Sequence, residues 1–167
     1  MSDQWINLVK QDGLLNLVPA IFRTYEVCLA AVGRYGRALQ HVPEHLKTIE
    51  ICKVALRNQA GALEYVPDHL KSYNVCLDTV YLHGIAAEFV PKKFLCDEIC
   101  LASVSNRWAL DRIPKEFRTE KVCLKAVSLN GCMLQRVPEK TYDVCLAAVK
   151  DYGLGLEWVP EEFKTNE

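Results

Sequence analysis

Seven prolines recur along this chain at almost constant intervals. They are Pro19, Pro43, Pro67, Pro91, Pro114, Pro138 and Pro160, and their spacings are 24, 24, 24, 23, 24 and 22 residues. Six of the eight cysteines keep the same register: Cys28, Cys52, Cys76, Cys100, Cys123 and Cys145. A unit of this length cannot bury its own apolar face, so units that share a register stack and form a continuous core. The sequence therefore predicts a repeat protein.

Each unit is expected to contain one α-helix. In a typical unit, Val75, Cys76, Thr79 and Val80 recur one helical turn apart and form an apolar face. A preceding Thr or Ser suits an N-cap, and a following Gly suits the end of the helix. These signals predict N-caps at Thr24, Thr48, Ser72, Thr119 and Thr141, and helix ends at Gly36, Gly84, Gly131 and Gly153.

A shorter helical segment is expected between each of these glycines and the next proline. The residue before a proline is pushed out of the helical region, which limits the segment to one or two turns. Pro-x-x-Leu or Pro-x-x-Phe then makes a second brief turn, since Pro is favourable at the start of a helix. The predicted fold class is all-α: a right-handed α-solenoid of about six 24-residue repeats, each with one long helix and one short Pro-kinked segment.

Residues 1–167 are expected to form a single helical-repeat domain with atypical ends. Residues 1–13 predict an N-terminal cap helix in which Trp5 takes the Cys position, and residues 154–167 predict an incomplete last repeat. The pattern changes near residues 105–108, where the Gly is missing, and again at residues 138–141, where two residues are missing. We expect the local geometry to change at both places.

One family of repeats shares this pattern. The segment Arg37–Thr48, followed by Ile51 and Cys52, resembles bacterial repeats of a domain family of unknown function, which typically contain Gly-x-Ala-Leu-x-x-Val-Pro-x-x-Leu-Lys-Thr and then Val-Cys-Leu-x-Ala-Val. The resemblance covers nearly the whole chain and implies an all-helical array from a bacterium, including one that lives with a host. It carries no catalytic residues. In unit length the chain is also similar to the leucine-rich repeat variant, in which α-helices and 3₁₀-helices alternate.

Composition argues against several classes of function. The 20 basic and 21 acidic residues give a net charge of −1, whereas a general nucleic-acid binder carries a basic excess. No apolar run approaches the length of a membrane span, which is about 18 residues or more. The first five residues lack the features of a secretory signal.

The cysteines and histidines are the residues of this chain that could carry redox or metal chemistry. A periodic column of Cys beside Val and Ala predicts buried, reduced thiols rather than disulfides, and hence a cytoplasmic protein, although delivery into a host cell stays open. Cys96 and Cys132 lie off the column, and Cys96 takes a capping position where a helix N-terminus lowers a thiol pKa. A redox or metal-binding protein that uses Cys96 is therefore an alternative. The four histidines predict no metal site, and we expect neither a cofactor nor an enzyme.

Two positions of the repeat vary among large side chains while their neighbours keep their type. The first row lies two residues before each Pro and includes His41, Tyr65, Phe89, Arg112, Arg136 and Trp158. The second row lies three residues before each column Cys and includes Tyr25, Tyr73 and Tyr142. Tyr, Trp and Arg are enriched at binding hot spots. These nine residues are the predicted partner-binding surface.

The predicted function is a non-catalytic protein-interaction scaffold or adaptor, as an effector module or as an inhibitor or immunity protein. A second alternative is RNA binding through a ladder of basic residues four positions after Pro, formed by Arg23, Lys47, Lys71, Arg118 and Lys164. Acidic residues in the same turns argue against this alternative, because they cancel much of its field. The partner is expected to be another protein, with no membrane and an undetermined oligomeric state.

Overall fold

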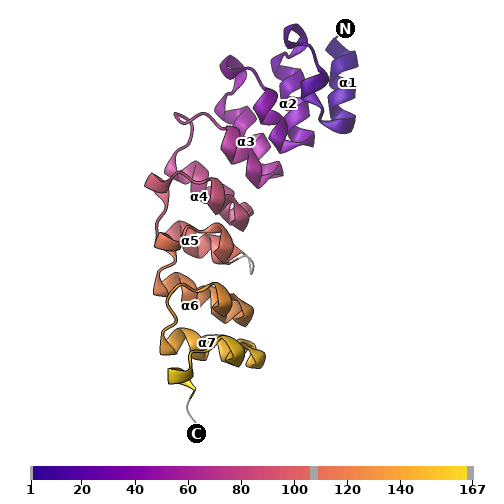
Figure 1. Ribbon diagram of the computed structural model, residues 1–167. Helices are drawn as coiled ribbons and strands as arrows, with labels where there is room; N and C mark the ends of the chain where they lie inside the picture. The colour runs from indigo at the N-terminus through magenta and orange to yellow at the C-terminus, as the bar shows by residue number, and fades with distance from the viewer. Residues whose placement is uncertain (1, 106–108, 165–167) are drawn as a thin grey trace. The chain divides into compact units, whose positions relative to one another are not determined.

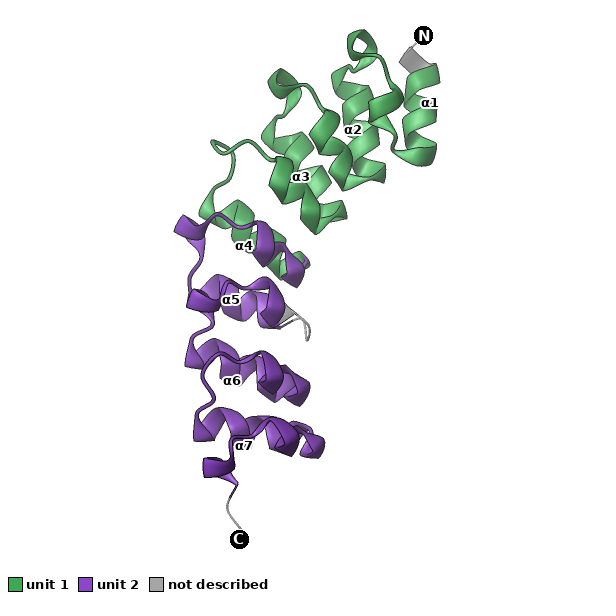
Figure 2. Ribbon diagram, viewed as in Figure 1, with its two compact units in different colours: residues 1–82 green, residues 83–167 purple. Residues whose placement is uncertain are grey.

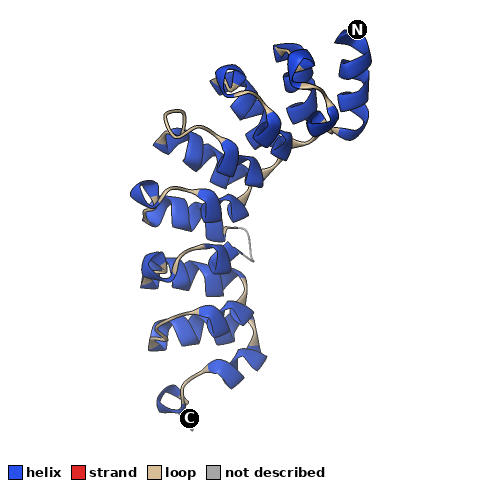
Figure 3. Ribbon diagram, turned by 45° about the horizontal axis from the view of Figure 1, so that its top comes forward, coloured by secondary structure: helices blue, strands red, loops and turns tan. Residues whose placement is uncertain are grey.

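The computed structural model describes residues 2–105 and 109–164. Among these residues there is no β-strand, and helices are joined by short connections (Figure 3). The described residues form these α-helices: α1 (Ser2–Asp12), α2 (Tyr25–Arg34), α3 (Ile49–Asn58), α4 (Tyr73–Leu82), α5 (Asp97–Val104), α6 (Glu120–Leu129) and α7 (Tyr142–Asp151). The all-α prediction is confirmed.

A 3₁₀-helix follows each α-helix and ends two residues before the proline. These segments are η1 (Leu15–Leu17), η3 (Gly36–His41), η5 (Ala60–Tyr65), η6 (Gly84–Phe89), η8 (Ala109–Arg112), η10 (Gly131–Arg136) and η11 (Gly153–Trp158). The residues after η1, η3, η5, η6, η10 and η11 have an extended backbone, as Val42 shows with φ −71° and ψ 128°. This is the conformation that a following proline imposes, and it ends the helix.

Most prolines begin a second, three-residue 3₁₀ turn. These turns are η2 (Ala20–Phe22), η4 (Glu44–Leu46), η7 (Lys92–Phe94), η9 (Lys115–Phe117) and η12 (Glu161–Phe163). After Pro138 the chain makes only a bend before α7, because this connection is two residues shorter than the others. The other predicted irregularity, at residues 106–108, lies outside the described residues.

The chain divides into two compact units, Met1–Leu82 and His83–Glu167, and each stacks its helices side by side (Figures 1 and 2). In unit 1, α1 packs on α2 and α2 on α3; in unit 2, α5 packs on α6 and α6 on α7. The six column cysteines are buried. The single-domain organisation of residues 1–167 stays a prediction.

The capping residues behave largely as expected. The hydroxyls of Thr24, Thr48, Ser72 and Thr141 accept hydrogen bonds of 3.3–3.4 Å from backbone N–H groups in the first helical turn. Thr119 is also an N-cap, but its hydroxyl donates to Asp97 Oδ1 at 3.1 Å instead. It therefore joins α6 to the preceding repeat.

The glycines have a different role from the one expected. Gly36 and Gly131 begin a 3₁₀-helix and do not end the α-helix in a left-handed conformation; among described non-terminal residues, only Gly13 has a positive φ, at 68°. A Cβ atom on Gly131 would lie 2.4 Å from the carbonyl oxygen of Ala148. A Cβ atom on Gly36 would lie 2.5 Å from the carbonyl oxygen of Ala55. Glycine is needed here because the next α-helix approaches the backbone closely.

Candidate interaction surface

The first-row residues occupy one structural position, the last residue of a 3₁₀-helix. Each is half-buried or exposed, whereas the Val or Ile that follows it is buried. Of the nine predicted residues, His41, Tyr65, Tyr25 and Tyr73 lie in unit 1, and Phe89, Arg112, Arg136, Trp158 and Tyr142 lie in unit 2. The structure therefore divides the predicted residues between the two units.

In unit 1, arginines of the preceding repeat or turn contact the first row, at the side chain of Tyr65 and at the backbone of His41. Arg37 donates to the Tyr65 hydroxyl at 3.1 Å, and its guanidinium carbon lies 5.7 Å from the centre of the Tyr65 ring. Arg23 donates to the backbone oxygen of His41 at 3.0 Å. Burial, and secondly the charge of Arg23, lower the pKa of the His41 imidazole, so His41 is neutral at pH 7.

In unit 2, the first row forms ion pairs from one repeat to the next. Arg112 contacts Glu88 at 3.0 Å, and Arg136 contacts Asp111 at 3.6 Å. In both pairs the acid lies three residues before one Pro and the arginine two residues before the next. Both arginines remain half-exposed. Glu88 and Asp111 are not among the residues predicted from the sequence, although both stand directly before a first-row residue.

The second-row residues are the first residues of their α-helices. In two other repeats the residue three positions before Cys is acidic, namely Asp97 and Glu120. Each accepts a hydrogen bond from the N-cap of the next helix: Thr119 donates to Asp97, and Thr141 donates to Glu120 at 2.7 Å. Tyr25 and Tyr73 are half-buried. Tyr142 is exposed, and its ring meets Phe163 edge-on with 6.1 Å between centroids. Much of the variation in this row is therefore tied to repeat-to-repeat contacts.

The basic ladder is engaged within the protein. Arg23 donates to the backbone oxygens of Val18 and His41, and Arg118 donates to those of Ile113 and Arg136, at 2.8–3.0 Å. The three lysines pair instead with the acid three residues earlier, and the side chains of Lys47 and Lys71 are only 13% and 12% exposed. The RNA-binding alternative stays a prediction, and these contacts are what an RNA phosphate would have to compete with.

Four of the six column thiols lie in surroundings that disfavour the thiolate. Burial raises the pKa of Cys28, Cys52, Cys100 and Cys123 to about 11, so they are protonated at pH 7. Off the column, Cys96 is the half-buried N-cap residue of α5, and Cys132 lies half-buried in η10. Among the described residues, no group of three or more His, Cys, Asp or Glu side chains is placed to hold a metal ion. No helix over residues 2–105 and 109–164 is long and apolar enough to cross a membrane.

Comparisons with known proteins give one family. No curated protein and no solved structure matches the chain. The model of the family described as Domain of unknown function (DUF4116) matches residues 24–71 and 119–164, more than half of the 167 residues. Each match spans two successive repeats, α2 to η5 and its following turn in unit 1 and α6 to η12 in unit 2. The chain belongs to this family of domains of unknown function, DUF4116.

Proposed function

We propose that this chain is a non-catalytic protein-binding scaffold of bacterial origin. The observation that supports this is the ridge of unit 2, formed by Phe89, Arg112, Arg136 and Trp158. These residues end the 3₁₀-helices η6, η8, η10 and η11 of four successive repeats. Its two arginines are half-exposed while their guanidinium groups are held by Glu88 and Asp111. A surface whose side chains are already ordered loses less entropy on binding, so a few anchors can dominate affinity.

The proposal includes a setting and two forms of the function. Buried thiols that are protonated at pH 7 suit a reducing compartment, and we therefore place the scaffold in a cytoplasm, that of the bacterium or of a host cell. Such a ridge suits two forms of the function. One is an effector module that binds a host protein, and the other is an inhibitor or immunity protein that blocks an enzyme. The partner in either form is a protein with acidic groups that contact the exposed parts of Arg112 and Arg136 while these stay paired with Glu88 and Asp111.

A capture experiment with matched variants tests this proposal. The ridge variant is Arg112→Ala with Arg136→Ala, and the control is Lys121→Ala with Lys125→Ala, which removes two exposed charges from α6 of the same unit. Circular dichroism checks that both are folded, and nuclease treatment of the lysate removes RNA bridges. We expect that the wild type and the control capture the same protein. The ridge variant should capture at least ten-fold less of it. Equal retention by all three would contradict the ridge, and retention of no protein would contradict the scaffold.

A further inference from the structure

The sequence contains one Asn-Gly pair, Asn130–Gly131, and it stands where α6 passes into η10. In flexible peptides Asn followed by Gly deamidates readily, because glycine puts no side chain in the way of the attacking nitrogen and adopts many conformations. In the folded chain Asn130 is half-buried and Gly131 is buried. The pair therefore joins a reactive sequence to a closed setting, and the contacts around it decide whether it reacts.

Deamidation at this pair is a reaction between two groups of the chain itself. The backbone nitrogen of Gly131 attacks Cγ of Asn130, and the new N–C bond closes a five-membered succinimide ring. The side-chain amide leaves as ammonia and takes up the proton that the Gly131 nitrogen loses. Water then opens the ring at either carbonyl and gives aspartate or isoaspartate. No electrons are transferred, and water is the only co-reactant.

The backbone conformation of Asn130 opposes ring closure. The ring forms only when Cβ of Asn130 and N of Gly131 lie on the same side of the bond between Cα and the carbonyl carbon, which in an L-residue requires a negative ψ. Asn130 has φ −156° and ψ 97°, so the Gly131 nitrogen points away from Cβ. The side chain is fixed as well, because its Oδ1 accepts a hydrogen bond from Cys132 N–H at 3.2 Å.

The next repeat holds the attacking nitrogen. Gly131 N–H donates to Oδ2 of Asp151, the last residue of α7, at 2.7 Å. The nitrogen must give up its proton in order to attack, and next to this carboxylate that step would bring two negative charges together. The hydrogen bond therefore keeps the nitrogen protonated and unreactive while α7 is in place.

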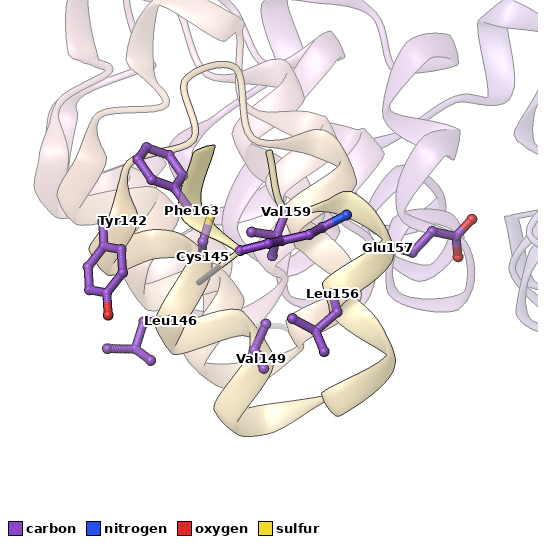
Figure 4. A pocket seen from close by; sticks show the side chains of 9 residues that line it. Tyr142, Cys145, Leu146, Val149, Leu156, Glu157, Val159 and Phe163 are labelled. Carbon is purple, nitrogen blue, oxygen red and sulfur yellow. The ribbon is translucent and has the colours of Figure 1, made fainter. Parts of the chain in front are cut away.

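α7 also packs on η10 and limits how far the start of η10 can turn. A Cβ on Gly131 would lie 2.4 Å from the backbone oxygen of Ala148, on the side of α7 that carries the carboxylate. Another side of this helix, with Leu146 and Val149, lines an apolar cleft and does not contribute (Figure 4). Rotation toward the reactive ψ would carry the start of η10 against α7, so ring closure requires that α7 moves away.

We propose that Asn130–Gly131 is a deamidation site that α7 keeps closed, and that it reacts when α7 leaves η10. Local opening of this kind costs less free energy than global unfolding. The products hinder reclosure: aspartate at position 130 adds a negative charge close to Asp151, and isoaspartate lengthens the backbone by one methylene. Deamidation thus records each opening of this repeat interface. This chemistry does not depend on the proposed scaffold function.

Four forms of the full chain and one peptide test the site. Beside the wild type, Asp151→Ala removes the acceptor, whereas Asp151→Asn keeps a side-chain oxygen in its place. Asn58→Ala is the matched control, because Asn58 holds the same repeat position in unit 1 and its Nδ2 donates to two backbone oxygens of the preceding repeat. The peptide covers residues 126–136, which is also the tryptic fragment that contains Asn130.

The proteins and the peptide are incubated at mildly alkaline pH, and mass spectrometry of the fragment measures the rate at which the amide becomes an acid. A zero-time sample corrects for conversion during digestion. We expect the wild type, Asp151→Asn and Asn58→Ala to react at least ten-fold more slowly than the peptide. Asp151→Ala should react at least three-fold faster than the wild type.

Circular dichroism checks that the variants are folded. If Asp151→Ala is not, Thr141→Ala takes its place, because it removes the N-cap of α7 and loosens the same helix. The proposal is overturned if the wild type reacts as fast as the peptide, or if Asp151→Ala reacts no faster than the wild type or Asp151→Asn. Equal acceleration by Asp151→Ala and Asn58→Ala also overturns it, because the opening is then not that of α7.

Discussion

At the scale of single residues, Gly131 and Gly153 hold the same position of successive repeats in different surroundings. A Cβ on Gly131 would lie 2.4 Å from Ala148 O and 2.8 Å from Tyr152 Cβ, whereas one on Gly153 has open space. We expect Gly131→Ala to lower the free energy of unfolding by about 1–3 kcal/mol through overpacking. Gly153→Ala should raise it by about 0.4–1 kcal/mol, because it restricts only the unfolded chain. Urea unfolding measures both, and equal effects would contradict the close approach.

These glycines also show a limit of prediction from the sequence. A Gly after a helical segment suggests a left-handed helix end, which is a local property. The actual reason is the approach of a helix one repeat later, and this is visible only in the fold. Thr119 is similar: its place as an N-cap follows from the local pattern, whereas its hydrogen bond to Asp97 depends on the stack.

At the scale of the elements, the turns after proline are held in two alternative ways. Where the ladder residue is Lys, an acid stands directly after Pro, as in Glu44 with Lys47. Where it is Arg, that position is not acidic: Ala20 accompanies Arg23, and Lys115 accompanies Arg118. The arginines bind two backbone oxygens instead. The basic residues form one row in the sequence, but the structure divides them into a lysine type of turn and an arginine type of turn.

The two kinds of turn predict an unequal result for a conservative change. Arg118→Lys should lower the free energy of unfolding by about 1.5–3 kcal/mol, because a lysine does not reproduce the fork that binds Ile113 and Arg136. Adding Lys115→Glu supplies the acid of the lysine type and should restore part of the loss. A double-mutant cycle measured by denaturant unfolding tests this. Additive effects of the two substitutions would contradict the pairing.

At the scale of the whole molecule, the buried thiols link stability to alkaline pH. Cys28 in unit 1 and Cys123 in unit 2 have pKa values of about 11 in the folded chain, above the ordinary thiol value. A raised folded pKa means that the stability due to the neutral thiol is complete below the unfolded pKa and is lost as pH rises through the folded one. The free energy of unfolding should therefore fall between about pH 9 and pH 11.

Variants separate this effect from other groups that titrate in the same range. The double variant Cys28→Ala, Cys123→Ala starts from a lower stability but should lose less of it between pH 9 and pH 11 than the wild type. Urea unfolding across this range measures both slopes. Parallel slopes would show that the thiols do not carry the pH dependence.

The repeat architecture was predictable because it rests on many weak signals in one register. The columns of Pro, Cys and Val predicted the helices and the buried core. The candidate surfaces were less predictable. Tyr65 contacts Arg37 and Arg112 contacts Glu88, each one repeat earlier, and such contacts depend on how the repeats stack.

The contacts of Arg23 and Arg118 with the next repeat have a consequence for protein engineering. Arg23 and Arg118 fix the first-row position of the next repeat through a carbonyl oxygen, that of His41 and of Arg136. Every amino acid carries this carbonyl, so the backbone is anchored there whichever side chain is present. Libraries randomised at residues 41 and 136 should consist mainly of folded members, and new binding specificities can be selected from them without redesign of the array.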